Sequence, residues 1–289
     1  MSFSAVLKKR GERSILPAVF QQTADGEMKY LDIHSHIFPS NIAGKVIHQL
    51  ETYYGCKWDG TGESDDLLES LESAGIDRSV IFSSATKPSQ VPAIHNYIHT
   101  QMLQHPDKFI GFGTMHPDFA DYRAEIRKIR DLGMKGMKFH PDFQQFHVDD
   151  PRMLKIYEEA GDNLILLFHI GDKRTDFSSP RRLANVLKIL PGLKIVAAHM
   201  GGYSEWENSW ELIGKDLWMD ISSTMPMLSP EKARELVLAH GTDKVLFGSD
   251  YPAVHHGKAV EQVLSLGLSP EDNEKIFYRN AESLLNIRL

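Results

Sequence analysis

The chain has 289 residues, 42% of them hydrophobic, and a formal net charge of −7 at pH 7. This charge argues against nucleic acid or an anionic membrane as the main partner. The single cysteine, Cys56, excludes an intrachain disulfide and favours a reducing, cytoplasmic setting. No apolar run reaches the roughly 18–20 residues that a transmembrane helix requires.

Residues 1–28 are predicted to be an N-terminal extension. Four basic residues between positions 8 and 13 precede an apolar run at 15–20, an order that faintly resembles a signal peptide. The apolar run is shorter than the roughly 7–15 residues of such a peptide. We therefore expect the segment to pack on the main domain, which we place at residues 29–289.

The first predicted strand, residues 31–36, carries a pair of histidines. Residues two apart in a strand point to the same face, so His34 and His36 project together, with Asp32 behind them. Two adjacent imidazoles are half of a metal site. The pattern also occurs by chance, so the interpretation depends on the rest of the chain.

Helical patterns alternate with short apolar runs along the remaining sequence. Further strands are predicted at residues 79–82, 109–113, 136–140, 164–169, 194–199, 217–221 and 245–250. Helices are predicted at residues 65–74, 91–103, 122–132, 153–160, 180–190, 206–213, 231–240, 259–266, 270–277 and 281–285. Eight such units predict an α/β fold, a single-domain (β/α)8 TIM barrel. The alternative, a doubly wound open sheet, normally has a glycine-rich loop after its first strand, which residues 35–39 do not provide.

In such a barrel the active site lies at the C-terminal ends of the strands. The polar residues at these ends are His34, His36, Lys138, His140, His169, His199 and Asp250. Any one of these histidines could be a hydrogen-bonded structural residue, but their convergence predicts a metal site. Imidazole and carboxylate ligands without a thiolate suit a divalent ion. We expect one Zn²⁺, with Fe²⁺, Mn²⁺ or Ni²⁺ as alternatives.

Five motifs give the chain a family resemblance. They are Asp-Ile-His-Ser-His (32–36), Lys-Phe-His-Pro (138–141), Phe-His-Ile-Gly (168–171), Ala-His-Met-Gly-Gly (198–202) and Phe-Gly-Ser-Asp-Tyr-Pro (247–252). From about residue 30 to its end, the chain resembles the second family of the amidohydrolase superfamily, which includes aminocarboxymuconate-semialdehyde decarboxylase. Residues 279–285 are similar to the closing helix of that family.

The resemblance implies a role for each rim residue. The metal ligands would be His34, His36, His169 and Asp250. His199 would contact the metal-bound water or the substrate, so that Asp250 and His199 are the predicted catalytic residues. Relatives of this kind often form dimers, and we expect a small-molecule substrate and a homodimer.

The fourth strand leaves an ambiguity about the number of metal ions. Some members of the superfamily place a carboxylated, bridging lysine near the position of Lys138. We predict one ion, with Lys138 as a structural or substrate-contacting cation and His140 as pocket lining. Asp32 is predicted to be a hydrogen-bonding group of the barrel interior.

Two reactions fit this apparatus. The first is hydrolysis of an amide, ester or lactone of a small carboxylated molecule, in which Asp250 accepts the proton of a metal-activated water. The alternative is non-oxidative decarboxylation of an aromatic or unsaturated carboxylic acid. A more remote alternative, a metal-binding scaffold without activity, would be expected to lack ligands that this chain retains.

The loops after the strands are expected to bind the substrate. Arg174 is a candidate partner for a substrate carboxylate, with Lys138, His140 and Tyr203 as further contacts. Aromatic residues that could enclose a flat substrate are Phe38, Phe143, Phe146, Tyr203 and Trp206.

Overall fold

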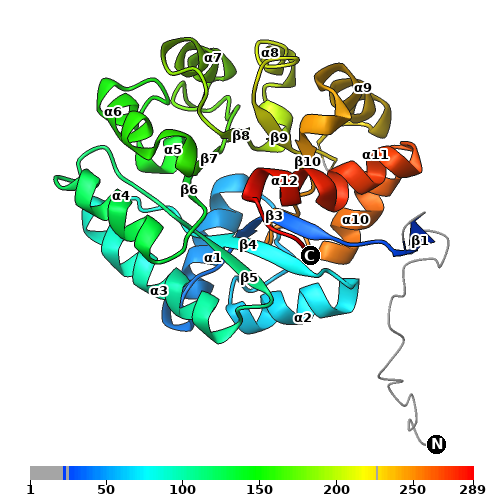
Figure 1. Ribbon diagram of the computed structural model, residues 1–289, viewed down its shortest axis with the longest axis horizontal. Coiled ribbons are helices and arrows are strands. Elements are labelled where there is room, and N and C mark those ends of the chain that lie inside the picture. Colours follow the sequence, from blue (N-terminus) through cyan, green and yellow to red (C-terminus); the bar gives the residue numbers. More distant parts are fainter. Residues whose placement is uncertain (1–21, 24–25, 226) are drawn as a thin grey trace, which may run out of the picture.

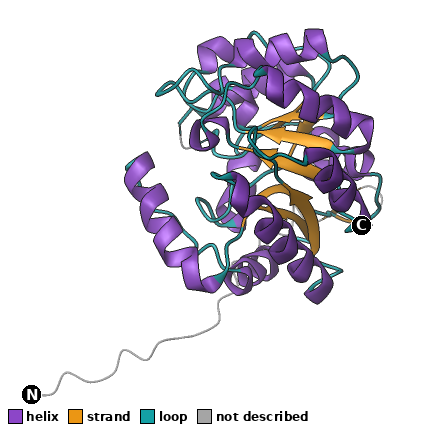
Figure 2. Cartoon of the chain, turned by 90° about the vertical axis from the view of Figure 1, so that its left-hand side faces the viewer, coloured by secondary structure: helices purple, strands orange, loops and turns teal. Residues whose placement is uncertain are grey.

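The computed structural model describes residues 22–23, 26–225 and 227–289. Eight parallel strands form a barrel that helices surround (Figures 1 and 2), which confirms the predicted single-domain (β/α)8 fold. Most of the predicted extension lies outside the described residues, apart from the short antiparallel pair β1 (Gln22–Thr23) and β2 (Gly26–Glu27). None of the described helices is long and apolar enough to cross a membrane.

The barrel strands follow one another in sequence order, and every ladder between them is parallel. They are β3 (Leu31–His36), β4 (Arg78–Phe82), β5 (Phe109–Gly113), β6 (Gly136–Phe139), β7 (Ile165–Phe168), β8 (Ile195–Ala197), β9 (Trp218–Asp220) and β10 (Val245–Leu246). Several strands end earlier than predicted, so that His140, His169 and Asp250 lie in the loops just beyond them.

The described helices match the predicted ones closely, with two additions. The described helices are α1 (Ser40–Tyr54), α2 (Ser64–Ala74), α3 (Val91–Gln104), α4 (Tyr122–Asp131), α5 (Pro141–Gln144), α6 (Pro151–Ala160), α7 (Pro180–Ile189), α8 (Trp206–Ser209), α9 (Pro230–His240), α10 (His256–Leu264), α11 (Pro270–Glu274) and α12 (Asn280–Leu285). Short 3-10 turns lie at Pro88–Gln90, Gly161–Asn163, His199–Gly201 and Thr242–Lys244, and a π-helical turn at Lys275–Arg279 joins α11 to α12. The sequence did not predict α1, in which only Ala43 is buried, or the single turn α5.

Serine followed by proline marks the start of three of these helices, α7, α9 and α11. Proline suits the first helical position because its ring fixes φ and that position needs no hydrogen-bond donor. The Ser229 and Ser269 side chains also accept a backbone N–H from the first turn of their helices. The local sequence therefore determines where these helices begin.

The barrel closes through hydrogen bonds between the segment after β10 and β3. The backbone N–H of Ile33 donates to the carbonyl of Phe247 (3.0 Å), and that of Asp250 donates to the carbonyl of His34 (3.0 Å). The N–H of His36 in turn donates to the carbonyl of Tyr251 (2.7 Å). This closure brings the end of the eighth strand beside the histidine pair of the first.

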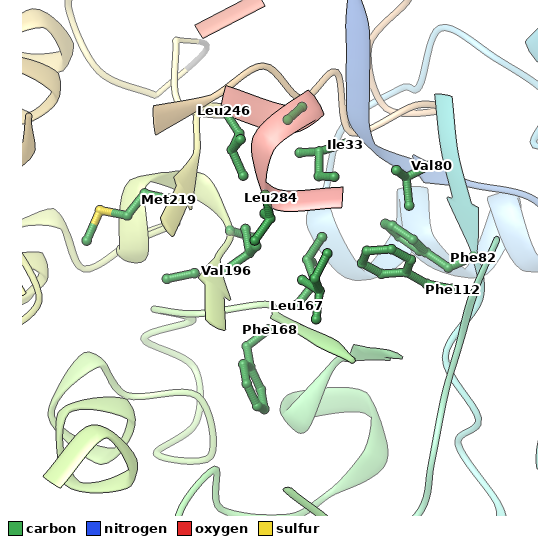
Figure 3. Packing of buried hydrophobic residues seen from close by; sticks show 14 of the residues in the cluster. Ile33, Val80, Phe82, Phe112, Leu167, Phe168, Val196, Met219, Leu246 and Leu284 are labelled. Carbon is green, nitrogen blue, oxygen red and sulfur yellow. The ribbon is translucent and has the colours of Figure 1, made fainter. Parts of the chain in front are cut away.

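Apolar side chains from the strands and from the C-terminal helix form one continuous core (Figure 3). Ile33, Val196 and Leu246 belong to it, together with Leu284 of α12, and all four are at least 95% buried. Burial of such side chains stabilises a fold by roughly 1.5–3 kcal/mol each. The core thus holds the strand ends, and the polar residues beyond them, in fixed positions.

Candidate metal centre

Two histidines and a carboxylate converge at the closure of the barrel. His34 Nε2 lies 3.3 Å from His36 Nε2 and 3.2 Å from Asp250 Oδ1, and His36 Nε2 lies 3.6 Å from the same oxygen. The three ligand atoms are within 4.8 Å of one another. Zinc and related divalent ions bind such a donor set. The residues therefore fit a divalent ion, and His34, His36 and Asp250 lie together.

The orientation of the His34 ring is set by Asp220, at the end of β9. The Nδ1–H of His34 donates to Asp220 Oδ2 at 2.8 Å, and both side chains are fully buried. A proton on Nδ1 leaves the lone pair of Nε2 directed at the centre. Burial alone would raise the pKa of Asp220, but the charges of His34 and His199 hold it well below its usual range. Because Asp220 stays ionised, it continues to accept the proton of His34 Nδ1 and so maintains this tautomer.

Lys138 lies inside the barrel against the same ring. Its Nζ donates to His34 Nε2 at 3.0 Å and lies 5.1 Å from the centre of the Phe82 ring. Burial lowers the pKa of Lys138 to about 8. The ammonium and a metal ion would compete for one lone pair of His34, so Lys138 contacts the centre rather than the pocket wall.

His169 and His199 form the next part of the rim. His199 Nδ1 donates to the carbonyl of Ser222 (2.9 Å), so in the neutral ring Nε2 is an acceptor. His169 Nδ1 lies 2.9 Å from that Nε2. His169 thus directs Nδ1 into the barrel mouth, beside His199. It does not belong to the compact group of His34, His36 and Asp250.

A close approach of two loops holds these histidines together. A Cβ on Gly171 would lie 2.5 Å from the backbone of Gly202, and Gly171 has a φ of +92° that favours glycine. The glycines that follow His169 and His199 in the sequence therefore allow their loops to touch.

Charges and burial set the protonation of the centre. Burial and the charge of Lys138 hold the pKa of His36 well below its usual range, and burial lowers the pKa of His199 to about 4. The pKa of Asp250 is also well below its usual range, since the neighbouring histidines outweigh the opposing effect of burial. At neutral pH His36 and His199 are accordingly neutral and Asp250 is ionised, whereas the carboxylates of Asp220 and Asp250 raise the pKa of His34 against the effect of burial.

Strained backbone is concentrated on this rim. His199, Ser223 and Asp250 have φ values of +59°, +48° and +62°, a region that residues other than glycine seldom occupy. Such conformations cost energy and cluster at functional sites. Ser223 also donates its hydroxyl to Asp250 Oδ2 at 2.5 Å, which fixes the free side of that carboxylate.

A cavity of about 820 Å³ opens over the centre. His36, His169 and Asp250 line it, as do the predicted contacts His140 and Tyr203. Its aromatic lining comprises Phe38, Tyr53, Tyr54, Trp58, Tyr97, Phe143 and Tyr203. The cavity therefore has a metal-ligand floor and largely apolar walls that include these aromatic rings.

Several predicted residues lie elsewhere. Arg174 does not line the cavity, because its guanidinium pairs with Asp172 (2.8 Å) and stacks 4.0 Å from the centre of the Tyr53 ring. Phe146 is buried in the core, and Trp206 begins α8 away from the cavity lining.

Asp32 is a fully buried hydrogen-bonding group of the barrel interior, 2.8 Å from His256 Nε2.

Sequence reasoning missed Asp220 and most of the aromatic wall. Asp220 ends an apolar run, as the predicted rim residues do, and that signal was available in the sequence. Tyr53 and Tyr54 come from α1, and Trp58 follows it, so they were missed with the helix. Asp142, which lies next to His140 and His169, had no signal of its own.

Comparisons with known proteins agree with this geometry. The family model described as Amidohydrolase matches residues 32–287. A 2-amino-3-carboxymuconate-6-semialdehyde decarboxylase of Dictyostelium discoideum is 22% identical over 329 aligned positions, covering 84% of this chain and 88% of its own length.

Solved structures show the same fold at low identity. A 2,6-dihydroxybenzoate decarboxylase in complex with 2,6-dihydroxybenzoate has a TM-score of 0.70 at 15% identity, covering 90% of this chain and all of its own. A dihydroxybenzoic acid decarboxylase of a Polaromonas species, with bound manganese and the inhibitor 2-nitroresorcinol, has a TM-score of 0.68 at 14% identity. That match covers 90% of this chain and 97% of the solved one.

Proposed function

Because the chain belongs to the amidohydrolase family, we propose that it is a metal-dependent decarboxylase of a small aromatic or unsaturated carboxylic acid. The observation that carries the proposal is the group of His34, His36 and Asp250, of which His36 and Asp250 line the floor of a cavity with aromatic residues in its walls. The names of the relatives favour decarboxylation, the alternative from the sequence, over the hydrolysis expected first.

Four residues would hold the metal ion: His34, His36, His169 and Asp250. When bound, a divalent ion acts as a Lewis acid that orients substrate oxygens and stabilises negative charge on them. Manganese is bound in one solved relative, and the same donor set suits zinc. We propose one ion per chain, with Lys138 as an interior cation rather than a bridge.

Asp250 is proposed to move the proton. It is the only carboxylate among the described residues that line the cavity, and its low pKa keeps it ionised until it accepts a proton. In the reaction the bond between the substrate carbon and its carboxylate breaks, and the electron pair stays on that carbon. Asp250 would take a proton from solvent water and deliver it to that carbon as carbon dioxide leaves. His199, neutral at pH 7, would orient the reacting groups through Nε2.

The walls of the cavity support a flat, conjugated substrate. Tyr54 and Tyr203 meet edge to face, with ring centres 5.5 Å apart, and Phe143 stacks on His140 at 4.0 Å. Aromatic faces pack well against a planar ring and exclude water from it. Lys57 and Lys258 also line the cavity with largely exposed side chains, and each pairs with a carboxylate, Glu51 at 2.6 Å and Asp59 at 3.4 Å.

The experiment that tests the function separates carbon dioxide release from hydrolysis. Purified protein is stripped with a chelator, reloaded with Mn²⁺ or Zn²⁺, and given hydroxybenzoates and unsaturated dicarboxylates, with lactones and aryl esters in parallel. We expect metal-dependent carbon dioxide release, and in D₂O one deuteron at the carbon that carried the carboxylate. Metal-dependent ring opening of lactones without carbon dioxide would instead establish the hydrolase.

A variant with an unrelated carboxylate removed provides the control. Asp216 pairs with Lys244, and its side chain is 88% exposed, so Asp216→Asn should keep full activity. Asp250→Asn tested beside it should release carbon dioxide at least about 1,000-fold more slowly. Equal activity of the two variants would exclude Asp250 as the proton carrier.

A further inference from the structure

Asp142, the second residue of α5, directs one unpaired oxygen at two histidines. Its Oδ1 accepts the hydroxyls of Ser178 (3.0 Å) and Thr175, both from the segment after β7. Its Oδ2 is buried and has no hydrogen-bond partner in the described part of the chain. The nearest ring nitrogens are His140 Nδ1 at 3.7 Å and His169 Nε2 at 4.0 Å, which are also buried and unpartnered.

The free nitrogen of His169 is opposite the one that faces the metal centre. Nδ1 lies toward His199 and the barrel mouth, whereas Nε2 lies toward Asp142. An imidazole can ligate a metal through Nδ1 only if its remaining proton is on Nε2. That N–H would then require an acceptor, and Asp142 Oδ2 is the carboxylate oxygen placed there. Metal-bound histidines commonly donate their second N–H to a carboxylate in this way.

A second metal ion between the three residues fits the geometry less well. The rings of His140 and His169 stack with centres 4.0 Å apart and planes only 11° from parallel. A metal ion lies in the plane of each imidazole that binds it, and two stacked planes cannot both contain one ion. The stack, extended by Phe143 on the other face of His140, instead fixes the orientation of both rings.

We propose that Asp142 is a positioning residue: when a metal ion binds, its Oδ2 accepts the proton of His169 at Nε2, which frees Nδ1 from its 2.9 Å contact with His199 Nε2 for the metal. The inference rests on the proposed metal centre but not on the reaction catalysed there. Tyr54 strengthens the arrangement, because its hydroxyl lies 3.1 Å from His140 Nε2 and holds that ring against His169. Asp142 is thus expected to act on metal affinity without touching the substrate.

Replacement of Asp142 by asparagine gives the sharpest test. The hydroxyls of Ser178 and Thr175 would keep the amide oxygen at the place of Oδ1, so that the NH₂ group faces His169 Nε2. An amide N–H there would make Nε2 an acceptor and move the ring proton to Nδ1, where it blocks the metal. Asp142→Ala removes the acceptor without imposing this tautomer. Asp149→Asn, which removes a partner of Arg182 outside the centre, is the control.

Metal affinity of the full chain is measured by competition with a chromogenic chelator, with Zn²⁺ as the probe. Loss of such a partner typically weakens binding 10–100-fold. We expect that loss in Asp142→Ala, at least as large a loss in Asp142→Asn, and less than a twofold change in Asp149→Asn. Wild-type affinity in folded Asp142→Asn, or a second bound ion in the wild type that Asp142→Ala abolishes, would overturn the proposal.

A spectrum of the wild type tests the same claim without depending on how the variants fold. In zinc-loaded protein with ¹⁵N-labelled histidine, the His169 ring, assigned with a His169→Gln variant, should show its proton on Nε2. A proton on Nδ1 would refute the role of Asp142. Metal binding with this signature but no carbon dioxide release would leave the inference standing and reject the proposed function.

Discussion

Asp220 and Asp32 form a natural pair for testing what orients the metal ligands. Both are fully buried in the barrel, and each lies 2.8 Å from a histidine ring nitrogen. Asp220 holds the ring of His34, whose other nitrogen faces the metal. Asp32 holds the ring of His256, which lies outside the centre, and contacts His34 only by accepting its backbone N–H (2.8 Å). Replacing each by asparagine perturbs similar hydrogen bonds, but only Asp220→Asn should alter the tautomer of a ligand.

The size of the effect follows from the contacts of each carboxylate. Asp220 Oδ1 accepts the backbone N–H groups of His199 (3.2 Å) and Ser222 (3.1 Å), so an amide oxygen would stay there and the NH₂ would face His34 Nδ1. The proton of His34 would then move to Nε2. We expect metal affinity to fall 10–100-fold, which corresponds to about 1.4–2.7 kcal/mol.

Asp32→Asn should destabilise the fold instead. Asp32 accepts bonds from the side chains of Ser35 (2.6 Å), Ser249 (2.7 Å) and His256, and a hydrogen bond to a charged group contributes roughly 1.5–3 kcal/mol. Affinity for Zn²⁺ and the urea midpoint are measured on both variants, at a temperature where circular dichroism shows them folded. Unchanged metal affinity in Asp220→Asn, or an equal loss in Asp32→Asn, would refute this account of ligand orientation.

Three further outcomes are expected. Asp250→Asn should reduce carbon dioxide release at least about 1,000-fold while its circular dichroism spectrum matches the wild type; near-normal turnover would exclude it as the proton carrier. His199→Gln should lower the turnover rate much more than the metal content, and lost metal would make His199 a ligand. The metal-free protein should become less stable as pH falls from 7 to 5, as measured by urea midpoints with a chelator present. The groups responsible are His36, His140, His169 and His199, whose pKa values are lowered in the folded state.

The sign of this pH effect follows from proton uptake. An unfolded histidine titrates near pH 6.5 and the folded His199 near about 4, so the unfolded chain binds more protons between these values. The stability is therefore present above pH 6.5 and lost as pH falls, by up to about 3 kcal/mol for His199 alone. The raised pKa values of His34 and Asp142 oppose this loss, but the pKa values of six histidines are lowered, since His116 and His240 share this direction. A midpoint that rises toward pH 5 would contradict the balance.

Local patterns in the sequence were sufficient to predict the barrel and the residues that lie at its rim. Alternation of apolar and polar residues depends on side chains two to four positions apart, and it located the eight strands and most helices to within a few residues. It missed α1, since a helix with one buried residue has little apolar periodicity to detect. The rim position of His34, His36, His169, His199 and Asp250 followed from the rule that such strands end at one face.

Only the tertiary structure decided which partner each ligand has. Asp220 meets His34 across 186 positions of sequence, and Tyr54 meets His140 across 86, distances over which no spacing rule operates. The same holds for Arg174. Its charge indicated a contact with the substrate, but in the folded chain its guanidinium pairs with Asp172 and stacks on the Tyr53 ring. The sequence by itself determined which residue types reach the rim, because strand periodicity is local. The tautomers of the histidines and the walls of the cavity depend on contacts that exist only once the barrel has closed.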